Sequence, residues 1–116
     1  MEKGRTLPEG SVKTPEGDET VKHYVLLKLA AGVDRQAAFK RVEETYGALE
    51  KELPYLHHAQ VYLNCVDRDS NADIMAVIDL DGPEFLQPYL THPLHMRMAQ
   101  DMKDSLCGRT SFDREY

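Results

Sequence analysis

The sequence has few of the features that mark exported, membrane-bound or nucleic-acid-binding proteins. It has no tryptophan, and its two cysteines, Cys65 and Cys107, are too few for a framework of disulfides. No apolar run approaches the roughly 20 residues of a membrane-spanning helix, and no signal-peptide pattern is found. Acidic residues outnumber basic ones by 20 to 14, so a basic surface for nucleic acid is not expected. We therefore expect a cytoplasmic protein with reduced thiols that contacts neither membrane nor nucleic acid.

The composition is that of one folded domain preceded by a different kind of segment. The chain has 116 residues, of which 41% are hydrophobic and 29% charged, as is ordinary for a single globular domain. Residues 1–20 hold three glycines and two prolines but few large apolar groups, so they bury too little surface to offset their ordering entropy. We predict a flexible N-terminal arm at residues 1–20 and one domain at residues 21–116.

The first strand is predicted at Val21–Leu29, a segment rich in valine, leucine and tyrosine. Alternation of side chains places His23, Val25 and Leu27 on one face of this strand, and His23 is the polar residue of that face. A histidine in such a position is either a satisfied core residue or part of the wall of a cleft. In the second case Val25 and Leu27 are expected to bind the same ligand.

An amphipathic helix follows this strand. Asp34 is suited to its N-cap, and Pro54 would end it. Between them, apolar side chains recur with helical spacing at Phe39, Val42, Tyr46, Leu49 and Leu53.

Three more strands and a broken helical region complete the domain. Strands are predicted at residues 59–66, 74–80 and 110–114. One helical segment is predicted from Pro83 and should be short or kinked because of Pro88, and a second runs from Pro93 to about Leu106 and is ended by Gly108. The order β-α-β-β-α-β is typical of the ferredoxin-like α+β fold, with an antiparallel sheet in the order 4-1-3-2. That order separates Cys65 from Cys107. Because two helices cover one face of such a sheet, the other face needs a partner, and we expect a homodimer.

The segment from Tyr89 to His95 carries the strongest indication of chemistry. Tyr89, His92 and His95 are spaced by three residues, and Pro93 divides two helical pieces between them. One interpretation is structural, with Tyr89 in the core and His92 holding the backbone before Pro93. The other is a site of proton transfer, because imidazole titrates near neutral pH. In that case His95 and Tyr89 are predicted to face one cavity with His23 on its wall, and His92 is a candidate for substrate contact.

Other patterns are read as structural. The alternating acidic residues of Asp67–Asp73 lack the glycine and glutamate of a calcium loop, and His57 and His58 are expected at the surface. His23, His92 and His95 would be three possible metal ligands, but no acidic partner for them is visible, so no metal and no cofactor are predicted.

The segments just described resemble the stress-responsive dimeric α/β-barrel (Dabb) family. The resemblance covers about residues 21–115 and rests on Val21-Lys22-His23, Leu53-Pro54, Asp73, Phe112-Asp113 and above all the motif Tyr89-x-x-His92-Pro93-x-His95. It implies a homodimer in which two ferredoxin-like sheets close into a dimeric α/β barrel. One plant member is a polyketide cyclase that catalyses an intramolecular aldol condensation with a tyrosine and the second histidine of this motif. Those positions are Tyr89 and His95 here, and His23 matches a pocket residue.

Two classes of function follow from these features. The first is a cofactor-independent cyclase, isomerase or lyase that binds a small carbonyl or phenolic compound in an apolar pocket. There His95 would abstract a proton, Tyr89 would donate a hydrogen bond to the developing oxyanion, and His23 would assist. The second is a non-catalytic binding or stress-related module in which the histidines are structural.

Overall fold

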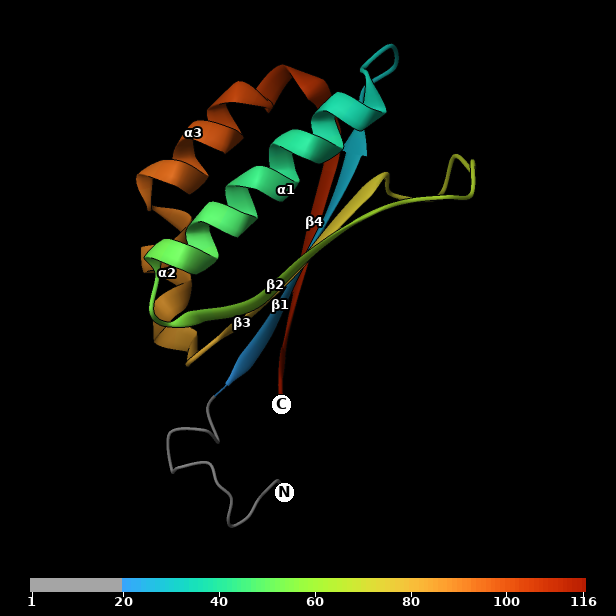
Figure 1. Ribbon diagram of the computed structural model, residues 1–116. Coiled ribbons are helices and arrows are strands. Elements are labelled where there is room, and N and C mark those ends of the chain that lie inside the picture. The colour runs from blue at the N-terminus through green and yellow to red at the C-terminus, as the bar shows by residue number, and fades with distance from the viewer. Residues whose placement is uncertain (1–19) are drawn as a thin grey trace.

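The computed structural model describes residues 20–116, so the predicted arm at residues 1–20 lies outside the described residues apart from Thr20. One four-stranded antiparallel sheet carries the helices on one of its faces (Figure 1). In chain order the elements are β1 (Val21–Leu29), α1 (Arg35–Glu52), β2 (Leu56–Leu63), β3 (Ile74–Leu80), α2 (Leu86–Leu90), α3 (Pro93–Asp101) and β4 (Leu106–Glu115). The predicted ferredoxin-like α+β class is confirmed.

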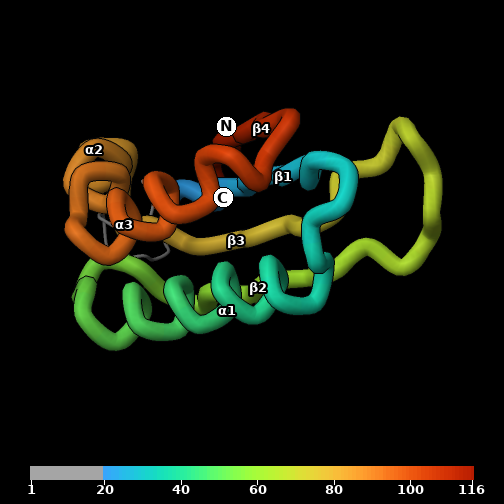
Figure 2. The backbone as a smooth tube through the Cα atoms, turned by 90° about the horizontal axis from the view of Figure 1, so that it is seen from above, coloured from blue at the N-terminus to red at the C-terminus, as the bar shows by residue number. Residues whose placement is uncertain are grey.

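The strands lie in the order β2-β3-β1-β4, as expected. Figure 2 follows this order from β2, beside α1, to β4 at the opposite edge. The pairing register sets His23 of β1 opposite Ile78 of β3 on one side and opposite Asp113 of β4 on the other. Directly opposite residues of antiparallel strands share a face of the sheet, so His23 and Asp113 meet on the face that the helices cover.

Cys65 and Cys107 are both free thiols.

The first helix forms where its sequence pattern predicts. Its N-cap is Asp34, whose carboxylate accepts a hydrogen bond from the Ala37 N–H at 3.1 Å. Its last backbone bond runs from Leu53 to Leu49, just before Pro54. The buried face of α1 includes Val42, Tyr46 and Leu49. This face joins the side chains of β1 and β3 in the core.

The C-terminal third differs from the prediction in where its helix ends. The expected helix from Pro93 to about Leu106 stops at Asp101, and Lys103–Ser105 form one tight 3-10 turn before β4. Gly108 lies within β4 rather than ending a helix, and it pairs with Lys28. The apolar spacing favours a longer helix, but backbone hydrogen bonds to the exposed edge of β1 are available only to a strand. As a result β4 begins four residues earlier than predicted and includes Arg109.

The second strand is also displaced from its prediction. It runs over Leu56–Leu63 instead of residues 59–66, and its pairing with β3 shifts register between His57 and Gln60. The shift coincides with the positive φ of His58, 55°. Cys65, which was expected within this strand, therefore lies beyond it and is exposed.

The face of the sheet opposite the helices is apolar at its centre. Strand alternation and register place Tyr24, Leu26, Met75 and Phe112 there. Phe112 is 62% exposed.

Among residues 20–116, none of the helices is both long enough and apolar enough to cross a lipid bilayer.

Candidate functional site

Tyr89, His95 and His23 come together between the helices and the sheet. The Tyr89 ring lies edge-on to both imidazoles, with ring centroids 4.9 Å from His95 and 5.5 Å from His23. All three side chains are buried, at 0%, 5% and 3% exposure respectively. The rings of Tyr89 and His95 can meet because the helix is broken between α2 and α3. Pro93 begins a new helix there, and the change of direction turns His95 toward Tyr89.

Tyr89 is joined to a residue that sequence analysis assigned only to the core. Its hydroxyl lies 2.5 Å from the hydroxyl of Tyr46 on α1, and one of the two donates to the other. Burial raises the pKa of both phenols, and for Tyr89 the neighbouring Tyr46 raises the pKa further. Both groups are therefore protonated near neutral pH. Since two hydroxyls carry two protons and their mutual bond uses one, a second proton remains to be donated to another oxygen.

His95 is a neutral base in a buried position. Burial lowers its pKa, the nearby Arg109 guanidinium lowers it further, and a backbone contact with Leu90 acts in the opposite direction. Among the described residues, the buried Nδ1 of His95 has no hydrogen-bond partner. A buried acceptor without a partner is unfavourable unless something else fills that role, which marks this nitrogen as a candidate contact for a ligand.

His23 is oriented by a carboxylate that sequence analysis did not identify as a partner. Its Nδ1 lies 2.5 Å from Oδ1 of Asp113. A carboxylate accepts hydrogen bonds, so Nδ1 donates to Asp113. Within residues 20–116 the buried Nε2 of His23 has no hydrogen-bond partner. The contact depends on strand register, which periodicity in the sequence does not reveal.

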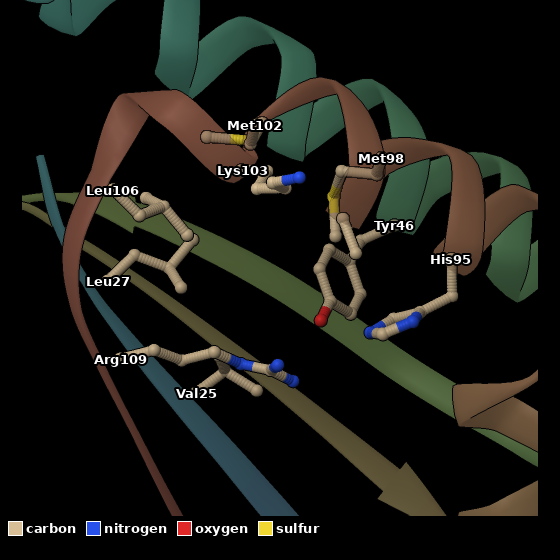
Figure 3. Close-up of a pocket in the computed structure, with 10 residues that line it drawn as sticks. Val25, Leu27, Tyr46, His95, Met98, Met102, Lys103, Leu106 and Arg109 are labelled. Carbon is tan, nitrogen blue, oxygen red and sulfur yellow. The ribbon is translucent and has the colours of Figure 1, made fainter.

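A cavity of about 200 Å³ opens beside His95 and Tyr46 (Figure 3). Its lining consists of Val25, Leu27, Tyr46, His95, Met98, Ala99, Met102, Lys103, Leu106 and Arg109. Three residues predicted for the site, His95, Val25 and Leu27, are among them.

Tyr89 and His23 lie off this wall, which differs from the expectation that both would face the cavity. Tyr89 is fully enclosed by the core, and its hydroxyl is linked to the wall through Tyr46. His23 is directed to Asp113 and the Tyr89 ring. The polar groups on the wall that match the expected chemistry are thus His95 and Tyr46.

His92 lies elsewhere and has a structural contact. It is the N-cap of α3, where its Nδ1 accepts a hydrogen bond from the Leu94 N–H at 3.1 Å. Its Nε2 lies 3.4 Å from a carboxylate oxygen of Glu52. The cavity lining does not include His92, which was predicted as a substrate contact. In the part of the chain that the structure describes, no three histidine, cysteine, aspartate or glutamate side chains gather as metal ligands would.

Arg109 and Lys103 are further residues of the wall that sequence analysis missed. Figure 3 shows the Arg109 guanidinium pointing toward the Tyr46 hydroxyl and the His95 ring. Arg109 pairs with Leu27 across β1 and β4, on the helix-covered face. The only signal for it would have been the correct start of the last strand, because alternation along that strand then places Arg109 on the same face as Asp113.

Comparison with known families identifies a domain that spans the described part of the chain. The model of the stress responsive A/B barrel domain family, Dabb, matches residues 21–116. Among curated proteins, no sequence matches this chain.

Solved structures share the fold at low sequence identity. A dimeric ferredoxin-like protein of unknown function from Bacteroides fragilis superposes with a TM-score of 0.74 and 24% identity, covering 84% of this chain and 96% of its own. A second dimeric ferredoxin-like protein, from Thermobifida fusca, has a TM-score of 0.66 and 23% identity, covering 84% and 91%. Hydroxynitrile lyase from Passiflora edulis has a TM-score of 0.70 and 13% identity, covering 85% and 94%.

Proposed function

The chain belongs to the stress responsive A/B barrel domain family, and from that premise we propose that it binds a small carbonyl or phenolic compound and transfers a proton on it. One observation carries the proposal. His95 is buried, its Nδ1 has no hydrogen-bond partner among residues 20–116, and it lines an apolar cavity together with the hydroxyl-bearing Tyr46. A base and a hydrogen-bond donor that share a small apolar cavity are the groups needed for enolate chemistry.

In the proposed step, neutral His95 takes the proton from the carbon next to a carbonyl group. The electron pair of the broken C–H bond moves toward the carbonyl oxygen, which becomes an enolate. Tyr46 donates a hydrogen bond to that oxygen, while Tyr89 donates to Tyr46 and leaves the Tyr46 proton free for the ligand. The high pKa of both phenols keeps them as donors throughout. The step requires no cofactor.

His23 acts in this scheme as a positioning residue. Its ring contacts the edge of Tyr89, and Asp113 fixes its orientation. It therefore holds Tyr89 in the place from which its hydroxyl reaches Tyr46. The enolate formed at His95 can be reprotonated or can attack a second carbonyl, which correspond to isomerase and cyclase reactions. In a lyase reaction His95 instead removes a hydroxyl proton, the new carbonyl forms as the adjacent C–C bond breaks, and the electron pair of that bond leaves with the departing carbon. Hydroxynitrile lyase, a neighbour in fold, supports the lyase type as a candidate.

Deuterium exchange tests the proposed proton transfer without knowledge of the natural substrate. In D2O the protein is expected to accelerate the exchange of the methyl protons of acetophenone, followed by NMR. His95→Ala should reduce the rate about 10²–10⁴-fold, because it removes the general base. Tyr46→Phe should reduce it by about 10²-fold, through loss of an oxyanion donor. Tyr89→Phe should have a smaller effect, because Tyr46 keeps its own proton.

The matched control is His57→Ala, which removes a surface histidine that contacts Asp81. Its exchange rate should equal that of the wild type. If His95→Ala exchanges as fast as the wild type, the assignment of His95 as base is wrong.

A non-catalytic binding module is the second candidate. The enclosed positions of Tyr89 and His23 favour it, since neither lines the cavity. It predicts that small phenols bind the cavity while the exchange of acetophenone stays at the rate of buffer alone.

The assembly proposed for this chain is a homodimer joined through the open faces of two sheets. Two structures with the same fold are described as dimeric. In this chain the open face presents Leu26 and Phe112 at its centre. An apolar sheet face without a covering layer is a common site of self-association.

A further inference from the structure

The charged residues on the cavity wall are of one sign. Arg109 and Lys103 line the cavity, and no aspartate or glutamate of residues 20–116 contributes to its wall. This distribution is opposite to that of the whole chain, which has 20 acidic and 14 basic residues and a net charge of −6. The local excess of positive charge is therefore a property of this cavity and not of the surface in general.

Arg109 differs from Arg41 and Arg35 in its contacts. Arg41 bonds to Asp101 at 2.7 Å, and the Arg35 guanidinium lies 3.4 Å from Asp73. Within residues 20–116, by contrast, no carboxylate forms an ion pair with Arg109. The nearest acidic residue along the same face of β4 is Asp113, which is engaged by His23. The guanidinium instead points toward Tyr46 and His95 (Figure 3).

The remaining wall is apolar. Apart from Tyr46, His95 and the two cations, it consists of Val25, Leu27, Met98, Ala99, Met102 and Leu106. At about 200 Å³ the cavity is small by comparison with the usual range of roughly 300–1,000 Å³ for ligand pockets. It therefore suits a compact ligand with an apolar body and one charged end.

We infer that the ligand of this cavity carries a carboxylate, which Arg109 binds while the apolar body lies against Val25, Leu27 and the methionines of α3. The inference rests on the proposed function and adds to it the class of substrate. A guanidinium presents two parallel N–H donors that match the two oxygens of a carboxylate. Lys103 contributes positive charge at the same wall, and the carbonyl to be activated faces His95 and Tyr46.

Binding of an anion has a consequence for the base. The positive charge of Arg109 contributes to the lowered pKa of His95. A carboxylate on Arg109 neutralises that charge and so raises the pKa of His95, which makes the imidazole a better proton acceptor once the ligand is bound. The ligand thereby strengthens the group that acts on it.

Calorimetry with benzoate and its neutral isostere benzamide tests the inference on the full chain. Benzoate should bind the wild type about 10- to 100-fold more tightly than benzamide, the range expected of a charge-assisted hydrogen bond. Arg109→Leu should weaken benzoate binding by a similar factor and leave benzamide binding unchanged, which also shows that the variant is folded. The matched control is Arg97→Leu, which removes the same charge from an exposed position of α3 outside the cavity.

An NMR titration of His95 gives a second readout. Its pKa should rise when benzoate is added and stay constant when benzamide is added. Equal affinity for the two probes, or an equal loss in Arg109→Leu and Arg97→Leu, would overturn the inference and leave proton transfer at His95 intact. Inorganic phosphate bound as tightly as benzoate would also overturn it, because the apolar wall would then play no part. Failure of both aromatic probes to bind the wild type would contradict the proposed function as well.

Discussion

The chemistry proposed for this protein depends on a few buried side chains that retain a free hydrogen-bond donor or acceptor within residues 20–116. His95 and His23 each retain one ring nitrogen that forms no hydrogen bond with any described residue. The hydroxyls of Tyr46 and Tyr89 carry two protons, and the hydrogen bond between them uses only one. Such groups reduce stability where they lie in a core, and their concentration around one cavity is typical of a functional site.

The pKa of His95 makes a testable link between this site and stability. The pKa is lowered from 6.5 in the folded protein, first by burial. At pH values between the lowered pKa and 6.5, His95 binds a proton in the unfolded chain but not in the folded one. The stability that His95 contributes is therefore present above pH 6.5 and is lost as the pH falls through that window.

The melting temperature should thus fall more steeply from pH 7 to pH 5 in the wild type than in His95→Gln, which does not titrate. Differential scanning calorimetry at several pH values measures the difference. Parallel curves for the two proteins would show that the folded state does not disfavour protonation of His95.

At the scale of elements, the break between α2 and α3 places the site. Tyr89 lies in α2 and His95 in α3, and their rings touch because the chain turns at His92 and Pro93. A continuous helix would put residues six positions apart on different faces, since one turn takes 3.6 residues. The interruption is therefore required for the pairing of tyrosine and histidine.

His92 supports this turn and gives a prediction of its own. As the N-cap of α3 it bonds the Leu94 N–H. His92→Ala should lower the free energy of unfolding by about 1 kcal/mol, the usual loss for an N-cap. Its rate of deuterium exchange should remain close to that of the wild type, in contrast to His95→Ala. Urea denaturation and the acetophenone assay measure the two effects. A rate as low as that of His95→Ala would instead place His92 in the proton transfer.

At the scale of the whole molecule, the two faces of the sheet have separate roles. The helix-covered face builds the core and the cavity, while the opposite face leaves Phe112 62% exposed. Proposed dimerisation through the open face would bury this apolar surface and leave the cavity wall, which lies on the other side of the sheet, with each protomer.

A charge on the open face should therefore dissociate the dimer. Phe112→Glu would place a carboxylate within the proposed interface, where its desolvation opposes association. The matched control is Met96→Glu, because Met96 is 55% exposed but lies on α3. Light scattering at micromolar concentration should give a monomer for Phe112→Glu and a dimer for the wild type and Met96→Glu. A monomeric wild type would refute the proposed assembly.

The sequence by itself determined the class of fold and indicated three residues of the cavity wall. Local periodicity and capping fix β1 and α1, because each depends on neighbours a few residues away, and the order of elements then indicates the ferredoxin-like sheet. The same local signals identified His95 beside a helix break and Val25 and Leu27 on one strand face.

Only the tertiary structure decided the partners of these residues. Asp113 meets His23, and Arg109 joins the cavity, through the register of β4 on β1, which the sequence does not encode locally. Tyr46 of α1 takes the place on the wall expected for Tyr89, whose side chain is fully enclosed and whose hydroxyl bonds to that of Tyr46. The predicted end of α3 was also wrong because of contacts between distant segments. Residues 106–115 pair with the free edge of β1, and this pairing outweighs the helical spacing of their apolar residues.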